Sequence, residues 1–343
     1  MFTKFIRLAI AWIVFFGVIT VLFFSSIPAM AENETQFPQP TTLPDPLATP
    51  LPSPALVPVP AWRPPLYPVP WALGQFDHFF FVRPIAANEV NWPQPSYRYG
   101  GSFFGENVPH TGVDFVTPIG TPVTAAGPGQ ISWIGYGLYQ GVFDEDDPYG
   151  LAIVILHDFG FNNKQLYTVY AHLSEILVFK GQRVETGDII GLSGDTGFTT
   201  APHLHFEIRN GTNNFYNTYN PELWLSPPQG WGVVVGRVTS SFGELLMNQE
   251  VRVINLDKDQ YWYAETYSTE FSINNDSYYR ENFVLSDLPA GNYRILIPYA
   301  GNWFETFIKI YPGAITYFNF RGYQYFTSSP PLPQIPKNIP PEE

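Results

Sequence analysis

Two histidines one residue apart, His203 and His205, are the first candidates for chemistry in this sequence. They belong to the stretch His203-Leu-His-Phe-Glu207, in which polar and apolar residues alternate. Alternation favours an extended strand, so both imidazoles should lie on one face and Leu204 and Phe206 on the other. Such a pair suits metal binding or proton transfer, and it equally suits a strand that is only half-buried, so other residues must decide.

Two other segments carry residues of the same kind. His110 and Asp114 stand four residues apart, and Gly112, Val113 and the β-rich surroundings favour an extended segment that presents both on one face. His172 ends an alternating segment that begins at Tyr167. Each signal is weak alone, because a lone histidine at a strand end is usually structural and the His-Asp spacing recurs by chance.

The sequence contains no cysteine, so any metal must be held by His, Asp or Glu side chains. Two histidines and one carboxylate make a three-ligand zinc site with an open fourth position for water, which is the catalytic pattern rather than the structural one. Zinc lowers the pKa of that water toward about 7 and polarises a carbonyl group. Amide hydrolysis then needs one more group to take and return a proton, and two histidines remain for that task.

Taken in order, these segments resemble the lysostaphin-type (LytM-like) zinc metallopeptidases, which cut the peptides of bacterial peptidoglycan. The resemblance covers roughly residues 79–227 and is carried by His110-x-x-x-Asp114, Tyr170-Ala-His-Leu173, Gly191-Leu-Ser-Gly-Asp-Thr-Gly197 and Pro202-His-Leu-His-Phe-Glu207. It implies that zinc is bound by His110, Asp114 and His205. It also implies that His172 and His203 act as general base and transition-state stabiliser, in either order. Glu207 is expected to orient a ligand imidazole, with a role as the base as the alternative.

Some features depart from the family pattern or stand outside it. The residues Phe198-Thr-Thr-Ala201 differ from the family's usual polar residues, which concerns substrate preference more than chemistry. The segment 137–148 is an apparent insertion, and we expect its acidic run to be a solvated loop tip. We expect His157 to be structural and His78 to lie before the core.

Three other functions compete with the peptidase interpretation. The turn at residues 180–191 resembles lipoyl or biotinyl carrier domains, but Lys164 and Lys180 lie outside the hairpin tip that a carrier needs. A non-hydrolytic cell-wall-binding or amidase-activating regulator on the same fold would lose metal or catalytic residues, and here all five are present. A purely structural adhesin would leave those five residues unexplained.

The elements that must position these residues are strands. After Gly74, short aromatic and β-branched segments alternate with Gly, Pro and Asn turns, which predicts an all-β chain. For residues 75–228 the resemblance implies a folded-over β-sandwich, the duplicated hybrid motif. Beyond the boundary at 227–230, residues 231–326 show the rhythm of a second β-sandwich.

The second predicted sandwich has no convergent titratable cluster, so we expect a spacer or adhesive accessory domain. Its strand pattern resembles carboxypeptidase-regulatory or prealbumin-like modules, and the resemblance is carried by Gly236, Val238, Val251, Val253, Phe283, Leu285, Leu288, Pro289, Ala290, Gly291 and Tyr293. Tyr261, Trp262 and Tyr263 suggest a sugar-stacking platform, although aromatic residues in such strands more often belong to the core.

The ends of the chain indicate where it works. Lys4 and Arg7 precede the apolar run 8–24, and the small-x-small signal at 29–31 follows, so residues 1–31 are predicted to be a signal peptide or an uncleaved N-terminal membrane anchor. Residues 32–74 form a Pro-rich linker, and residues 327–343 a Pro-rich disordered tail. The net charge of −13 argues against a nucleic-acid partner.

The sequence therefore predicts a zinc-dependent endopeptidase in the extracellular space or cell envelope, acting on peptidoglycan peptides and followed by a β-sandwich accessory domain.

Overall fold

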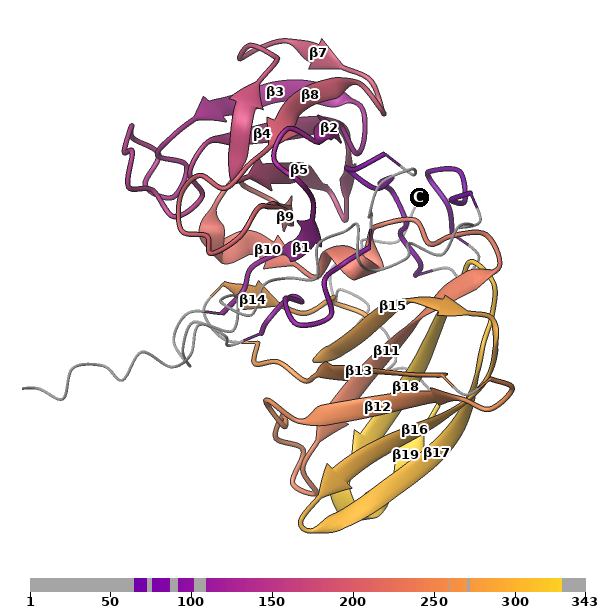
Figure 1. Cartoon of the computed structure of the whole chain (residues 1–343). Helices are drawn as coiled ribbons and strands as arrows, with labels where there is room; N and C mark the ends of the chain where they lie inside the picture. Colours follow the sequence, from indigo (N-terminus) through magenta and orange to yellow (C-terminus); the bar gives the residue numbers. More distant parts are fainter. Residues whose placement is uncertain are drawn as a thin grey trace, which may run out of the picture. The chain divides into compact units, whose positions relative to one another are not determined.

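The computed structural model describes residues 65–72, 76–86, 92–101, 109–258, 260–269 and 272–328, all within one structural unit (Figure 1). The predicted leader 1–31, residues 32–64 and 73–74 of the predicted linker, and the tail from 329 onward lie outside the described residues. Among the residues that are described, no helix has the length and apolar character needed to cross a membrane. The predicted anchor at 8–24 lies outside them and stays a prediction.

Strands make up almost all of the regular structure in the described ranges, which confirms the all-β prediction. The first part of the chain forms an eight-stranded sheet with the order β14-β10-β9-β5-β4-β3-β7, in which β1 also pairs with β9, and a three-stranded sheet with the order β2-β8-β6. These strands are β1 (Val113–Val116), β2 (Pro122–Thr124), β3 (Gly129–Gly135), β4 (Ala152–Phe161), β5 (Lys164–Ala171), β6 (Leu173–Ile176), β7 (Arg183–Val184), β8 (Ile189–Ser193), β9 (His203–Asn210), β10 (Thr218–Tyr219) and β14 (Ile273–Asn274). The short 3-10 helices η1 (Phe215–Asn217) and η2 (Pro221–Leu223) flank β10.

The hairpin between β4 and β5 sets the position of β5 beside β9. Its two turn residues, Asn162 and Asn163, both have positive φ angles of 51° and 58°. Asparagine tolerates this left-handed backbone, and a two-residue turn of this kind matches the twist of the strands it joins. β5 then pairs antiparallel with β9, with Ala171 opposite His205.

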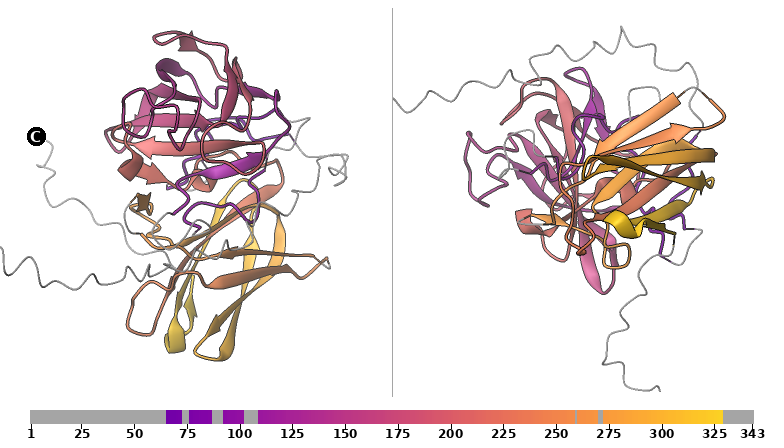
Figure 2. Two further views of the ribbon diagram at one scale, coloured as in Figure 1. Left: turned by 60° about the vertical axis from the view of Figure 1, so that its left-hand side comes forward. Right: turned by 90° about the horizontal axis from the view of Figure 1, so that it is seen from below.

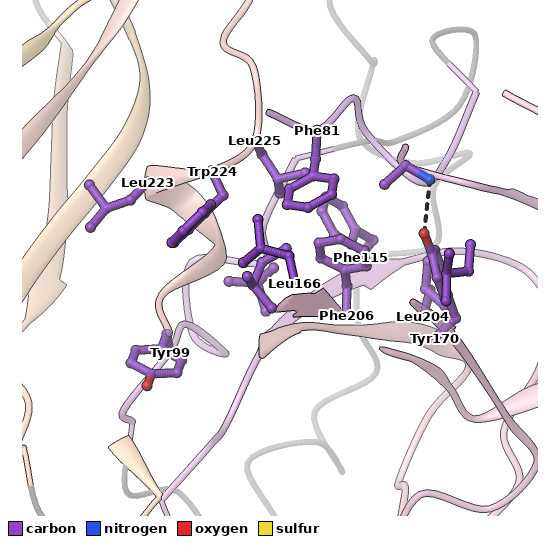
Figure 3. Close-up of a cluster of buried hydrophobic side chains, with 14 of the residues drawn as sticks. Phe81, Tyr99, Phe115, Leu166, Tyr170, Leu204, Phe206, Leu223, Trp224 and Leu225 are labelled. Carbon is purple, nitrogen blue, oxygen red and sulfur yellow. Dashed lines mark hydrogen bonds between the residues drawn. The ribbon is translucent and has the colours of Figure 1, made fainter. Parts of the chain in front are cut away.

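The core of the first part lies against one face of β9. Leu204, Phe206 and Ile208 are all fully buried there. Figure 3 shows Phe115 from β1 and Phe206 from β9 in this cluster, with Tyr170 accepting a hydrogen bond from the Ala126 backbone nitrogen at 2.8 Å. Burial of each large apolar side chain contributes about 1.5–3 kcal/mol, which fixes β9 and every residue on it.

The second part of the chain forms two four-stranded sheets, β15-β11-β18-β19 and β13-β12-β16-β17, whose strands are labelled in Figure 1 and seen from two further sides in Figure 2. Their strands are β11 (Trp231–Thr239), β12 (Glu250–Asn255), β13 (Gln260–Glu265), β15 (Phe283–Pro289), β16 (Gly291–Tyr299), β17 (Asn302–Ile310), β18 (Ile315–Arg321) and β19 (Phe326–Thr327), and the 3-10 helix η3 (Gly322–Gln324) joins the last two. Both sheets contribute to one buried cluster, with Val234 and Phe318 from the first sheet and Val253 and Ile295 from the second.

Two details of this second part differ from a simple reading of its sequence. Ile273 and Asn274 fall within the segment predicted to belong to the second sandwich, yet they pair in parallel with β10 of the eight-stranded sheet. In β13, Tyr261 and Tyr263 are exposed, whereas Trp262, which stands between them in sequence, packs against the core. The three neighbouring aromatic residues therefore divide between surface and core.

Candidate metal centre

Strands β1 and β9 place the candidate site on the face of β9 opposite the core. Their antiparallel register sets Asp114 directly across from His205. Because side chains alternate along a strand, the face opposite Leu204 and Phe206 carries the polar residues His203, His205, Glu207 and Arg209, all of them buried. The predicted strand and the predicted division of its two faces are both present.

Three donor atoms meet at this face: Nε2 of His110, Oδ1 of Asp114 and Nδ1 of His205. Each pair of these atoms is 3.0 Å apart. Donor atoms around a tetrahedral zinc ion, at about 2.0–2.1 Å from the metal, lie about 3.3–3.4 Å from one another. The three atoms therefore need to separate by only a few tenths of an ångström to hold such an ion. Two imidazoles and one carboxylate are also the donor types found in catalytic zinc sites, so the residues fit the metal.

His110 reaches the site from a loop rather than from the strand that carries Asp114, because β1 begins only at Val113. Its backbone nitrogen donates to the Gly101 carbonyl at 2.9 Å, and its carbonyl accepts from the Gly100 nitrogen at 2.7 Å. Its ring nitrogen Nδ1 donates to the Arg98 carbonyl at 3.2 Å, which leaves the lone pair on Nε2 facing Asp114.

Gly112 allows the close approach of this loop to β9. A Cβ atom at that position would lie 2.3 Å from the Phe206 carbonyl oxygen and 2.8 Å from Nε2 of His205. Real side chains do not make contacts that short, so any other residue would push the loop away from β9. His110 and Asp114 meet at the site because glycine stands between them.

His205 is held in the matching tautomer by Glu207. Its Nε2 donates to Oε1 of Glu207 at 3.2 Å, so its Nδ1 lone pair faces His110 and Asp114. Glu207 is fully buried and also accepts hydrogen bonds from Thr111, from the Tyr149 hydroxyl at 2.8 Å and from Nε of Arg209 at 2.8 Å. These contacts match the orienting role expected for Glu207 from the sequence.

His172 and His203 lie beside the three donor atoms, with their ring centroids 4.6 Å apart. Nδ1 of His172 donates to the Thr196 carbonyl at 2.8 Å, and Nδ1 of His203 donates to the Ala201 carbonyl at 2.7 Å. Each ring is thus anchored through Nδ1, which leaves Nε2 for chemistry; Nε2 of His203 lies 3.5 Å from Oδ2 of Asp114. His172 has a φ angle of 60°, a left-handed backbone that is strained for a residue other than glycine and that concentrates at functional sites.

The charges in this cluster shift the acid–base properties of its members. Burial alone raises the pKa of Asp114, but the neighbouring His110 and His203 lower it well below its usual range. Burial lowers the pKa of His205, but its hydrogen bonds to Asp114 and Glu207 outweigh burial and raise the pKa to about 9. A proton on His205 therefore competes with a metal ion for the same lone pair. Burial, together with His203 and His205, lowers the pKa of His172 well below its usual value.

The remaining two histidines lie away from these donor atoms. His157 in β4 is hydrogen-bonded at both ring nitrogens, to the Pro128 carbonyl at 3.0 Å and to Oγ1 of Thr168 at 2.8 Å. His78 does not lie before the core: it is fully buried, with its ring centroid 4.2 Å from that of Trp224. The apolar residues that follow it in sequence, Phe79 and Phe81, were the signal that this segment enters the core.

Four further residues at the site were not singled out in the sequence. They are Thr111, Tyr149 and Arg209, which donate hydrogen bonds to Glu207, and Thr196, whose carbonyl accepts from the ring of His172. Arg209 alone carried a signal, because alternation along β9 places it on the same face as Glu207. The other three come from loops, where no periodicity indicates which way a side chain points.

Comparison with known proteins identifies the region that contains these residues. Residues 108–217 match the family model of peptidase family M23. The chain is 46% identical over 101 residues to the peptidoglycan DD-endopeptidase ShyA of Vibrio cholerae, a match that covers 29% of this chain and 20% of that protein. It is 36% identical over 156 residues to lysostaphin of Staphylococcus simulans, covering 45% of this chain and 29% of lysostaphin.

Among solved structures, the catalytic domain of lysostaphin from Staphylococcus simulans has 34% sequence identity, covers 40% of this chain and 95% of that domain, and gives a TM-score of 0.33. The chain thus spans less than a third of the length of ShyA or of full-length lysostaphin. The family match includes His110, Asp114, His172, His203 and His205. The resemblance found in the sequence is confirmed, and residues 108–217 form a domain of peptidase family M23.

Proposed function

We propose that this chain is a zinc-dependent endopeptidase that hydrolyses peptide bonds in bacterial cell-wall peptidoglycan. The observation that carries the proposal is the set of three donor atoms on His110, Asp114 and His205, each pair 3.0 Å apart. Both imidazoles are fixed in the tautomer that turns a lone pair toward the others. The similarity to ShyA, a peptidoglycan DD-endopeptidase, together with the family match, supports peptidoglycan as the substrate class.

In this proposal zinc is held by His110, Asp114 and His205 and supplies a Lewis acid that polarises the scissile carbonyl and activates water near neutral pH. His172 and His203 handle the proton and the developing charge at their Nε2 atoms. One, as the neutral imidazole, accepts the proton of the attacking water at Nε2 and returns it to the leaving amine. The other, protonated on both ring nitrogens, donates a hydrogen bond from Nε2 to the carbonyl oxygen as negative charge develops on it. Their anchored Nδ1 atoms keep both rings oriented during these steps.

The location follows from the proposed substrate. Peptidoglycan lies outside the cytoplasm, so we place the chain in the extracellular space or cell envelope, exported by residues 1–31 as a signal peptide or anchor. Residues 32–74 then act as the linker, residues 75–228 as the peptidase domain, and residues 231–326 as an accessory domain.

The test uses the full chain, purified sacculi and a chelator. We expect one zinc ion per chain by elemental analysis, together with release of new amino groups from sacculi that chelator abolishes and added zinc restores. Zinc binding without release of amino groups would support the non-hydrolytic regulator instead. Absence of both zinc and release would overturn the peptidase proposal. The variant His157→Gln serves as the histidine control, because His157 lies outside the set of donor atoms, and it should leave both readouts unchanged.

A further inference from the structure

The loop at residues 137–148 has the expected solvated acidic tip at residues 144–146, but Asp147, which follows the tip, is buried. Asp147 and Tyr149 are 0% and 5% exposed, although acidic residues in the middle of the loop are exposed. Oδ2 of Asp147 accepts from the Tyr139 backbone nitrogen at 2.8 Å, and Oδ1 accepts from the Tyr149 backbone nitrogen at 2.9 Å. Asp147 thus joins the two ends of the loop, at Tyr139 and Tyr149, and fixes the backbone position of Tyr149.

The side chain of Tyr149 reaches the metal-site residues through Glu207. Its hydroxyl donates to Oε1 of Glu207 at 2.8 Å and accepts from a terminal nitrogen of Arg209 at 2.8 Å. The same oxygen of Glu207 accepts from Nε2 of His205. A single hydroxyl therefore links the carboxylate that orients His205 to the guanidinium that balances its charge.

The backbone of the same residue reaches His172. The Tyr149 carbonyl accepts from the His172 backbone nitrogen at 2.9 Å, at the residue whose φ angle is 60°. Two residues further on, the Leu151 nitrogen donates to Oγ1 of Thr196 at 2.9 Å. Thr196 is the residue whose carbonyl anchors the His172 ring. The segment 147–151 therefore holds both the backbone of His172 and the acceptor for its ring.

We infer that Tyr149 is a positioning residue that sets the metal ligand His205 through its hydroxyl and the proton-handling His172 through its carbonyl. The inference rests on the proposed function for the roles of the two histidines. It assigns to the apparent insertion 137–148 a task inside the site: its last turn, closed by Asp147, fixes the place of Tyr149.

The substitution Tyr149→Phe removes the side-chain contact and keeps the backbone one. Zinc affinity of the full chain, measured by competition with a chromogenic chelator, should fall about tenfold, as expected for loss of a group that supports a metal ligand. At saturating zinc, kcat on sacculus-derived peptides should return to within about twofold of wild type, because the contact to His172 remains. Tyr167→Phe is the matched control. Its hydroxyl donates to Oε1 of Gln165 at 2.9 Å and, among the described residues, to no metal-site residue, so it should leave zinc affinity within about twofold.

The substitution Asp147→Ala tests the other contact. Freeing the loop should displace the Tyr149 carbonyl and lower kcat at saturating zinc by about tenfold or more, since misplacement of a catalytic group by about 1 Å is that costly. Circular dichroism and thermal unfolding establish that the variant is folded. If it does not fold, Asp147→Asn, which keeps an oxygen acceptor for one of the two amides, should fold and show a smaller loss of kcat.

One measurement does not depend on zinc binding or catalysis. In the metal-free chain, nitrogen-15 spectra of the histidine side chains report hydrogen exchange at Nε2 of His205, which should be faster in Tyr149→Phe than in wild type because the hydroxyl that supports Oε1 of Glu207 is lost. If the wild-type chain binds no zinc, the proposed function fails while this comparison still tests the positioning role. Unchanged exchange together with unchanged zinc affinity would overturn the inference, as would a loss of kcat in Tyr149→Phe that saturating zinc does not restore.

Discussion

The substitution Glu207→Gln should weaken zinc binding by changing the tautomer of His205. Oε1 of Glu207 faces three donors, on His205, Tyr149 and Thr111, while Oε2 faces Arg209. Glutamine has one oxygen, and its amino group only donates. If the oxygen stays with Arg209, the amino group meets Nε2 of His205, which must become the acceptor. The His205 proton then moves to Nδ1, the atom that otherwise faces His110 and Asp114.

The magnitude follows from two separate losses. Changes to groups that orient a metal ligand lower metal affinity by about 10- to 100-fold, and we expect the upper end because the tautomer changes. The variant also leaves Arg209, which is 1% exposed, without its partner charge. Removing one member of a buried ion pair costs about 3–5 kcal/mol in the free energy of unfolding. That is less than the total for many domains, about 5–15 kcal/mol, so the variant should remain folded.

The assay pairs zinc competition with urea unfolding of the metal-free chain. Asp287→Asn is the matched control. Asp287 belongs to β15, is buried, and accepts a hydrogen bond at Oδ1 from Arg83 at 2.5 Å, so it forms a buried ion pair that includes none of the metal-site residues. The control should show a similar decrease in the free energy of unfolding and keep the zinc affinity of wild type. A folded Glu207→Gln variant that binds zinc as tightly as wild type would refute the tautomer argument.

The other predictions concern the roles of the two β9 histidines, the buried acid Glu281 and the core face of β9. His205→Ala should abolish zinc retention in elemental analysis, whereas His203→Ala should keep zinc and lose peptide release; equal zinc loss in both would show that the ligand is misassigned. Burial raises the folded-state pKa of Glu281 to about 8, so its stabilising contribution is complete below the unfolded value of about 4.5 and is lost as the pH rises toward 8. Glu281→Gln should therefore gain stability relative to wild type by a little over 1 kcal/mol per pH unit between pH 5 and 8 in urea titrations, and a constant difference would contradict the raised pKa. Phe206→Ala, at a fully buried position, should lower the free energy of unfolding by about 3–5 kcal/mol, and a loss below about 1 kcal/mol would mean that Phe206 does not fill the core.

The sequence predicts the centre of this site well because β9 follows a simple rule. Alternation in His203–Glu207 determines which side chains share a face, and the structure buries Leu204 and Phe206 on the other one. The sequence also predicts an extended segment at Asp114, and in the structure this residue lies in β1, opposite His205 of β9. The roles of the individual histidines came from the family resemblance rather than from spacing.

Residues that reach the site from loops could not be predicted in this way. His110 was expected on an extended segment with Asp114 but lies in a loop held by Gly100 and Gly101. Tyr149 directly follows the acidic loop 137–148, for which the sequence predicts exposure, and its burial depends on Glu207 and Arg209, which lie about sixty residues away in sequence. Long-range hydrogen bonds of this kind leave no local pattern, because the partner can be any polar residue that the fold brings near.

The two faces of β9 explain why such a site can be both buried and stable. Each polar residue on the site face would be destabilising if left without partners, since an unpaired buried polar group costs about 1–3 kcal/mol and a charge more. Here Arg209 balances Glu207, Glu207 orients His205, and His205 faces Asp114 of β1, so these four side chains form one continuous chain of contacts. The apolar face then anchors the strand in the core. A metal ion held by His110, Asp114 and His205 would complete this chain of charges, because the three donor atoms, now 3.0 Å apart, need to separate by only a few tenths of an ångström.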